Sequence, residues 1–286
     1  MSYKPIIIVA GEPNSVFFEL FFKVIRKKIK SPIILIASKE LIVKQAKVLG
    51  KKISFNVTSE FEIIKKKNKL KRINLINVNF SQTNGFGKIS SKSNSYITNC
   101  FDIAIRLLKN NISNKLINGP ISKKNFLQKK YLGITEYLCS EFSIKKNAML
   151  IFNNQLSVCP LTTHLPLKLV TKKINKDLIY DKVFLINKFY KKIFGLKPKI
   201  AITGLNPHCE SIDKFNEDDK ILRPVINILK KKKYKVSGPF SADTIFLKNN
   251  RKNYDVILGM YHDQVLTPLK TLYEYDAINI TLGLPF

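Results

Sequence analysis

The chain has 286 residues, of which 45% are hydrophobic, and this is enough apolar material to bury the core of one large domain or two of ordinary size. Lys and Arg number 50 against 20 Asp and Glu, so the formal net charge is +30. The four cysteines have no paired spacing, so neither a disulfide framework nor a zinc ribbon is indicated, and we expect a reducing cytoplasm as the location.

The positive charge is almost entirely lysine, in runs such as 65–67 and 230–233 that are spread along the chain with abundant Asn and Ile. This pattern is typical of a genome biased toward A and T codons. A specific nucleic-acid reader would carry more Arg, and aromatic residues inside its basic patches. We therefore expect no nucleic-acid partner; the alternative, a basic nucleic-acid binder, predicts affinity that falls steeply with salt. An anionic small substrate also suits the charge.

No apolar run approaches the roughly 20 residues needed to span a bilayer. The amino terminus runs almost directly into a strand-like segment at residues 5–10, without the long apolar segment and cleavage site of a signal peptide. We therefore expect a soluble protein that makes no membrane contact.

Short runs of β-branched residues alternate with longer, Lys-rich amphipathic stretches along the chain. This alternation predicts an α/β fold, with strands joined by crossover helices in a largely parallel sheet. The expected strands are residues 6–10, 33–37, 73–78, 115–117, 148–152, 156–161, 199–203 and 256–260. The expected helices are residues 15–30, 39–49, 93–110, 172–194, 218–232 and 242–249. A domain boundary is expected near residues 120–130.

Each of the three histidines follows an expected strand. They are His164 after 156–161, His208 after 199–203 and His262 after 256–260. Ligands of open α/β sheets bind beyond the carboxyl ends of the strands, so the three imidazoles can face one crevice. Such a set would suit a divalent transition ion such as zinc, with open positions for substrate. For each histidine alone, the alternative is an ordinary hydrogen-bonded loop residue, and their wide spacing leaves both interpretations open.

Other polar residues after strands have two interpretations each. The turn at Gly119-Pro120, with Ser122 and Lys123, suits a phosphate at a helix amino terminus or is an ordinary turn. Asp243, at the start of the expected helix 242–249, is interpreted first as a helix cap. Asp263 is either a carboxylate that orients the neighbouring imidazole or a turn residue.

Six short stretches stand out in order along the chain. They are 118–123 (NGPISK), 162–167 (TTHLPL), 204–208 (GLNPH), 238–244 (GPFSADT), 260–264 (MYHDQ) and 279–286 (NITLGLPF). With these stretches, the chain resembles the 4-hydroxythreonine-4-phosphate dehydrogenase family over nearly its whole length. In the family, the histidines of the second, third and fifth stretches bind a divalent ion (zinc, magnesium or cobalt). The implied metal ligands are His164, His208 and His262.

The resemblance also implies substrate-binding residues, an architecture and a cofactor. The Thr of a Gly-His-Thr-Glu motif, the Lys after the His-Asp-Gln stretch and the Asn of the last stretch correspond to Thr135, Lys270 and Asn279. Family members fold like isocitrate and isopropylmalate dehydrogenases, as two α/β domains around a cleft. They are homodimers whose metal site draws ligands from both subunits. This fold binds NAD without the Gly-x-Gly-x-x-Gly fingerprint, which the chain lacks, so no NAD-binding residues are assigned.

By the same resemblance, residues 1–125 form an amino-terminal α/β domain on the NAD side, and residues 126–286 form a second α/β domain with the metal, the substrate and the dimer contacts.

The implied reaction is oxidation by NAD, or NADP, of the C3 hydroxyl of 4-phosphohydroxy-L-threonine. Decarboxylation then gives 3-amino-2-oxopropyl phosphate for pyridoxal 5'-phosphate synthesis. A metal on the hydroxyl oxygen lowers its pKa, so that a base can take the proton as hydride leaves. Lys270 and Asp243 are both candidates for that base.

Three departures from the family pattern affect these expectations. Ile134 stands where the family's Gly-His-Thr-Glu motif has its His. Ser15 and Phe17 replace two glycines of an amino-terminal turn, which puts a close backbone approach there in doubt. Relatives continue past the position of Phe286 with a phosphate-binding Arg and a tail on the NAD side, so weak or absent activity is expected if 286 residues is the natural length.

These departures leave two alternatives beside the main interpretation. The first is a sister dehydrogenase that acts on another phosphorylated hydroxy acid, such as 4-phosphothreonate or 4-phosphoerythronate. The second is a non-catalytic, truncated relative that keeps the fold for binding or assembly. The presence of all three histidines argues against the second alternative.

Overall fold

The structure, a computed structural model, describes residues 3–66, 69–122, 124–127, 131, 133–212 and 215–286. The chain divides into two compact units, residues 1–137 with 285–286 (unit 1) and residues 138–284 (unit 2). The division falls inside helix α5 (Ile134–Glu141), later in the chain than the predicted boundary at residue 125. Among the described residues, no helix is both long enough and apolar enough to cross a membrane.

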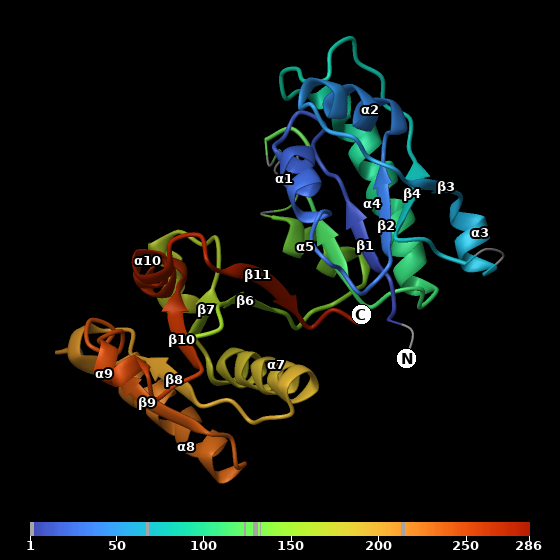
Figure 1. The fold of residues 1–286 in the computed structure, drawn as a ribbon. Helices are drawn as coiled ribbons and strands as arrows, with labels where there is room; N and C mark the ends of the chain where they lie inside the picture. The colour runs from blue at the N-terminus through green and yellow to red at the C-terminus, as the bar shows by residue number, and fades with distance from the viewer. Residues whose placement is uncertain (1–2, 67–68, 123, 128–130, 132, 213–214) are drawn as a thin grey trace. The chain divides into compact units, whose positions relative to one another are not determined.

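In its described residues, unit 1 holds a five-stranded, fully parallel sheet in the order β3-β4-β2-β1-β5 (Figure 1). The strands are β1 (Ile6–Val9), β2 (Ile33–Ala37), β3 (Asn56–Thr58), β4 (Ile73–Asn77) and β5 (Leu116–Asn118). The four predicted strands form within a residue of the expected bounds. Strand β3 has no counterpart in the prediction because three residues, two of them polar, give no apolar run.

The helices of unit 1 are α1 (Phe17–Val24), α2 (Lys39–Val48), α3 (Glu60–Ile64) and α4 (Asn94–Lys109), and α5 begins in this unit. Phe18 of α1 and Leu41 of α2 pack on Leu35 in one buried cluster, while α4 contacts β1 and β2. Helix α1 ends earlier than the predicted 15–30, because Lys27 and Lys28 add no apolar face to bury.

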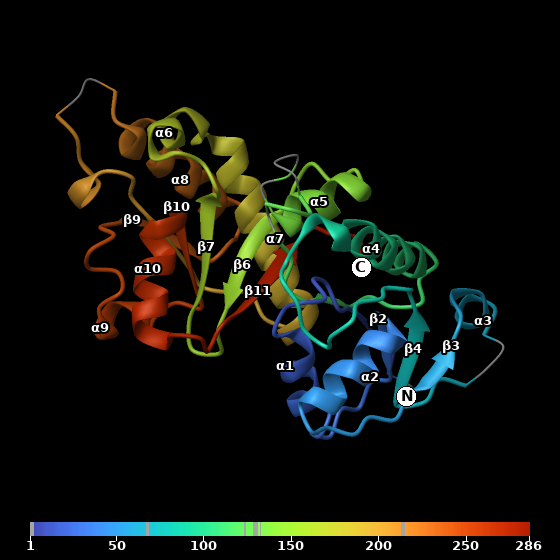
Figure 2. The same cartoon turned by 90° about the horizontal axis from the view of Figure 1, so that it is seen from above.

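Within its described residues, unit 2 holds a six-stranded sheet in the order β11-β6-β7-β10-β8-β9, whose strands are all labelled in Figure 1. Figure 2 shows the same sheet from above. The strands are β6 (Ala148–Phe152), β7 (Ser157–Thr162), β8 (Ile200–Thr203), β9 (Val236–Phe240), β10 (Val256–Tyr261) and β11 (Ile278–Leu282). Strands β7, β10, β8 and β9 are parallel. At one side, β6 pairs antiparallel with β7, and β11 pairs antiparallel with β6. The α/β prediction with a largely parallel sheet is therefore confirmed.

The helical segments of unit 2 are α6 (Val170–Lys173), α7 (Lys176–Phe194), a π-helical turn (Asp218–Leu222), α8 (Arg223–Lys231), α9 (Lys248–Arg251) and α10 (His262–Tyr273). Val183 of α7 and Leu229 of α8 pack on one face of the sheet. Val265 and Leu269 of α10 pack on the other face, against Ile257. The central strands are thus buried on both faces, which explains why they are almost wholly apolar.

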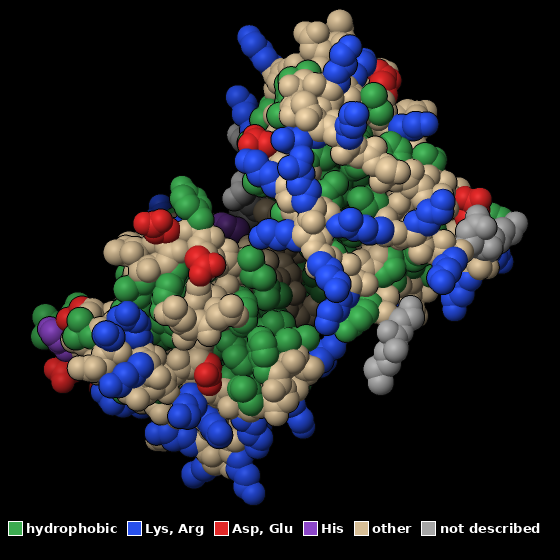
Figure 3. Space-filling model, in the orientation of Figure 1, with side chains coloured by type: hydrophobic (Ala, Val, Ile, Leu, Met, Phe, Trp, Pro, Cys, Tyr) green, Lys and Arg blue, Asp and Glu red, His purple; other side chains and the backbone are tan. Residues whose placement is uncertain are grey.

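The predicted helix 242–249 is wrong. Residues 242–247 form turns, and only the short α9 follows, because Ser241 and the polar residues after it bind one another instead of starting a helix. Lys and Arg side chains are spread over both units on the face shown in Figure 3. This distribution fits lysine runs that lie on solvated surfaces.

Candidate active site

Four neighbouring parallel strands of unit 2 lead into residues that the sequence singled out. In sheet order, β7, β10, β8 and β9 are followed by His164, His262, His208 and Asp243. Parallel strands end at the same edge of a sheet, so these side chains share the carboxyl edge. The edge position of Asp243 did not follow from the sequence, because the Gly238-Pro239 pair in β9 interrupts the strand pattern.

His164 and His262 lie next to each other. Their ring centroids are 6.0 Å apart. The pairing of Thr162 in β7 with Tyr261 in β10 brings both histidines to the same level, one or two residues beyond the strands. The buried Thr162 hydroxyl donates to the carbonyl of Met260 at 2.8 Å and ties the two strand ends together.

His262 is the first residue of α10, and its Nδ1 lies 2.7 Å from Oδ1 of Asp263. A carboxylate at one ring nitrogen orients the imidazole and directs the other nitrogen, Nε2, away from it. This geometry is the one expected if Asp263 orients a ligand imidazole.

His208 lies on a tightly held loop after β8. Its φ is +55 and that of Cys209 is +60, both in the left-handed region. The carboxylate of Asp218, which is fully buried, accepts from the backbone N–H of Leu205 at 2.9 Å and of Asn206 at 3.1 Å, and from the Asn206 side chain at 3.0 Å. Asp218 belongs to the site's framework, but its place in an acidic, helix-like stretch gave no signal of this.

Asp243 lies in the turn after β9, and the prediction that it caps a helix is wrong. The hydroxyl of Ser241 donates to its Oδ1 at 2.6 Å. This hydrogen bond is the largest cause that lowers the pKa of Asp243; desolvation opposes it, and the neighbouring His208 adds a smaller lowering. Asp243 is therefore a carboxylate at neutral pH.

One chain does not gather the three histidines at one point. Within the residues that the structure describes, no group of three or more His, Cys, Asp or Glu side chains is arranged to hold a metal ion. His164 and His262 form a pair, whereas His208 lies near Asp243.

The three predicted substrate-binding residues lie on α5, α10 and β11. Thr135 is half-buried in α5, in unit 1. Lys270 is exposed on α10, eight residues after His262 and so on the same side of that helix. Asn279 is exposed on β11 opposite Ile151, which puts it level with the beginning of β7 and not with its carboxyl end.

The turn at residues 119–123, a possible phosphate site, lies in unit 1 close to the end of β1. Ser122 accepts from the N–H of Asn125 at 3.2 Å and caps a turn, not a helix, while Lys123 lies outside the described residues. The ends of β1 and β5 lie close together, since a Cβ on Gly119 would lie 2.0 Å from the carbonyl oxygen of Ala10 and 2.8 Å from Cδ2 of Phe17.

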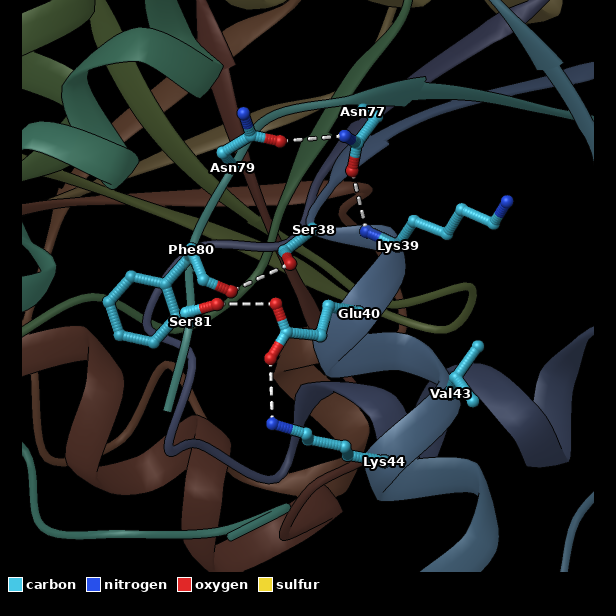
Figure 4. A pocket seen from close by; sticks show the side chains of 9 residues that line it. All are labelled: Ser38, Lys39, Glu40, Val43, Lys44, Asn77, Asn79, Phe80 and Ser81. Atoms are coloured by element: carbon cyan, nitrogen blue, oxygen red, sulfur yellow. Dashed lines mark hydrogen bonds and ion pairs between the residues drawn. The ribbon is translucent and has the colours of Figure 1, made fainter. Parts of the chain in front are cut away.

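A cavity of about 680 Å³ opens in unit 1, at the carboxyl ends of β2 and β4 (Figure 4). Glu40 in its wall is bound by Lys44 at 2.6 Å and by the hydroxyl of Ser81. Asn77 accepts from the N–H of Lys39 at 2.7 Å. The cavity contains none of the predicted site residues, and its polar groups bind one another, so the candidate site is the histidine edge of unit 2.

Comparisons with known proteins agree with this placement in a family. The family model described as pyridoxal phosphate biosynthetic protein PdxA matches residues 28–286. A relative named 4-hydroxythreonine-4-phosphate dehydrogenase, from Sulfurihydrogenibium sp., is 34% identical over 285 residues, which are 98% of this chain and 86% of the relative. Another named D-threonate 4-phosphate dehydrogenase, from Salmonella typhimurium, is 31% identical over 203 residues, 70% of this chain and 62% of the relative.

A crystal structure of 4-hydroxythreonine-4-phosphate dehydrogenase from Klebsiella pneumoniae has the same fold, with a TM-score of 0.82 at 24% identity over 99% of this chain and 89% of that one. The fold and the relatives together define an α/β protein of the dehydrogenase class. Within that class, the chain belongs to the PdxA family of pyridoxal phosphate biosynthetic proteins, and the resemblance found in the six stretches is confirmed.

Proposed function

We propose that this chain is a metal-dependent, NAD-linked dehydrogenase that converts 4-phosphohydroxy-L-threonine to 3-amino-2-oxopropyl phosphate and carbon dioxide, for pyridoxal 5'-phosphate synthesis. The observation that carries the proposal is the alignment of His164, His262, His208 and Asp243 at the ends of four adjacent parallel strands. Chemistry in open α/β sheets occurs at such an edge. Family membership supports dehydrogenation as the reaction.

The side chains at this edge fit a divalent transition ion. Imidazole nitrogens suit zinc and cobalt better than magnesium. His262 already has a carboxylate at Nδ1, as metal-bound histidines commonly do. We assign His164, His208 and His262 as the ligands. When bound, the ion would supply Lewis-acid stabilisation to an alcohol oxygen that loses its proton.

We further propose that two copies of the chain complete each metal site. His164 and His262 would come from one copy and His208 from the other, because a single chain does not gather three ligands. The loops after His164, His208 and Asp243 also carry apolar side chains that are more than half exposed. They are Leu167, Phe215 and Leu247, at 66%, 59% and 58% exposure. A second copy seated on these loops would bury them.

Lys270 and Asp243 are both kept as candidates for the base. A general base works best when its pKa lies near the working pH. The hydrogen bond from Ser241 lowers the pKa of Asp243, which makes this carboxylate a weaker proton acceptor.

Thr135, Lys270 and Asn279 are proposed to hold the phosphorylated substrate. A second candidate substrate is another phosphorylated hydroxy acid, such as 4-phosphothreonate. Ile134 favours this alternative, because an apolar side chain stands where the family has a hydrogen-bonding His, and one relative is named D-threonate 4-phosphate dehydrogenase.

The test is metal analysis of the purified full chain, joined to an assay of NAD reduction with each substrate. The main proposal expects bound zinc or cobalt, and turnover of 4-phosphohydroxy-L-threonine that exceeds turnover of 4-phosphothreonate. The reverse preference would assign the sister reaction. A protein that binds metal through the histidines but turns over neither acid would be the non-catalytic relative.

A further inference from the structure

The side chain of Gln264 joins two strand ends at the candidate site. Its Oε1 accepts from the backbone N–H of Met260 at 2.7 Å and from the hydroxyl of Thr203 at 2.8 Å. Its Nε2 donates to the carbonyl of Gly204 at 2.8 Å. One half-buried amide therefore connects the end of β10 to the end of β8.

Each of these strand ends leads to a proposed metal ligand. Gln264 lies two residues after His262, in the first turn of α10. Gly204, which it holds, begins the loop that carries His208. The far side of that loop is fixed by Asp218, so the loop is held between a buried carboxylate and the Gln264 amide.

Gly259 gives the first turn of α10 room to pack against β10. Gly259 in β10 has no side chain, and a Cβ there would lie 2.3 Å from Cγ1 of Val265 and 3.0 Å from Oε1 of Gln264. The first turn of α10 can therefore lie directly against β10. A glutamine fits here because one side chain must accept two hydrogen bonds and donate a third.

We propose that Gln264 is a positioning residue of the metal site, which sets the spacing between the strand end that carries His262 and the loop that carries His208. The inference rests on the proposed function, since it takes these histidines as ligands. Gln264 acts through the backbone of residues 203–204 and 260 and is not itself a ligand. In a pair of copies that exchange His208, it links the ligands of one metal site to those of the other.

The test compares Gln264→Met with a matched control, Gln45→Met, in the full chain. Gln45 is a fully buried glutamine of unit 1 whose Nε2 donates to the carbonyls of Pro13 and Gly85 at 2.8 and 2.7 Å. Metal-free protein is titrated with Co²⁺ and followed by its visible absorption. We expect Gln264→Met to weaken Co²⁺ binding about tenfold to a hundredfold, as loss of an outer partner does, and Gln45→Met to leave it within about twofold of wild type.

A second measurement needs no metal. Hydrogen exchange of the backbone amides in residues 204–209 should be faster in metal-free Gln264→Met than in wild type and unchanged in Gln45→Met. Gln264→Glu keeps the two acceptor contacts but turns a carboxylate oxygen toward the Gly204 carbonyl in place of the donor, so it should also weaken Co²⁺ binding and speed this exchange. If Gln264→Met binds Co²⁺ as tightly as wild type, the inference is wrong while the proposed function stands. If wild type itself binds no Co²⁺, the proposed function fails, and the inference with it.

Discussion

Two of the proposed ligands hold backbone conformations that side chains rarely adopt. The φ angles of His164 and His208 are +48 and +55. Such a conformation costs about 1–3 kcal/mol at a residue other than glycine, and it persists only where the surroundings enforce it. For His208 the enforcing group is Asp218, whose buried carboxylate accepts three N–H groups of the loop.

The first prediction concerns this carboxylate. Asp218→Ala leaves three part-buried donors without their acceptor, so we expect the free energy of unfolding of metal-free protein to fall by about 2–4 kcal/mol in urea titrations. Asp219→Ala is the control, because Asp219 forms an exposed ion pair with Arg223 at 2.7 Å, and its loss should cost about 1 kcal/mol or less. Equal losses in the two variants would contradict this role of Asp218.

The second prediction concerns Asp243 and pH. Because its folded-state pKa is lowered, Asp243 contributes stability that is present above its unfolded pKa and is lost as the pH falls through the folded pKa. Ser241→Ala removes the largest cause of the shift, so the pKa of Asp243 should rise toward its ordinary value of 3.8. Carboxyl NMR titration of metal-free protein measures the change. An unaltered pKa in the variant would show that another group holds the carboxylate ionised.

At the same scale, sequence reasoning located every histidine but missed the residues that hold them. Asp218 stands at the acidic start of the expected helix 218–232, and Gln264 ends the 260–264 stretch, in which only His262 and Asp263 were considered for the site. Their residue types do not show which backbone groups they bind. Their partners, Leu205 and Gly204, are distant in sequence and become neighbours only when the sheet forms.

At the level of elements, capping explains where a predicted helix divides. The expected helix 172–194 is two helices, α6 and α7, with Asn175 between them. Asn175 has an extended backbone, and its side chain accepts from the N–H of Leu178 at 2.8 Å. Asparagine is among the best residues for starting a helix in this way.

The third prediction follows from this cap. Asn175→Ala should lower the free energy of unfolding by about 1 kcal/mol, because the first turn of α7 loses its acceptor. Asn175→Asp, which keeps an acceptor at the same place, should retain most of the stability. Co²⁺ affinity should not change in either variant, since the apolar side of α7 packs on the sheet and α7 carries none of the proposed ligands. Urea titration and Co²⁺ titration together check both statements.

Three elements of unit 2 had no counterpart in the prediction. Strand β9 contains Gly238 and Pro239, which are rare in strands except at edges, and α10 contains Pro268. Strand β11 alternates polar and apolar residues, which is the ordinary pattern of a half-exposed strand, but the prediction relied on short apolar runs. Packing of β9 against β8 and of α10 against β10 decides their conformation over local preference.

At the scale of the whole molecule, the sharing of sites between copies is testable by mixing variants. The fourth prediction is that His208→Ala and His262→Ala, each inactive alone, regain about a quarter of wild-type activity when dissociated, mixed and reassociated in equal amounts. Random pairing makes half the dimers mixed, and each mixed dimer has one intact site of two. Assays of NAD reduction measure the recovery.

The matched control mixes His164→Ala with His262→Ala. Both of these ligands are proposed to come from the same chain, so every site in a mixed dimer lacks one of them and no activity should return. Recovery in the control, or none in the first mixture, would show that the ligands are divided between copies in another way.

The sequence alone determined the α/β class, most strands, the family and the identity of the candidate ligands. These depend on local patterns and short motifs, which can be seen without knowing what packs against what. Only the tertiary structure decided that four parallel strands bring His164, His262, His208 and Asp243 to one edge, and that one chain leaves the histidines divided. Sheet order and loop support are set by contacts between distant residues, and no single segment of sequence encodes them.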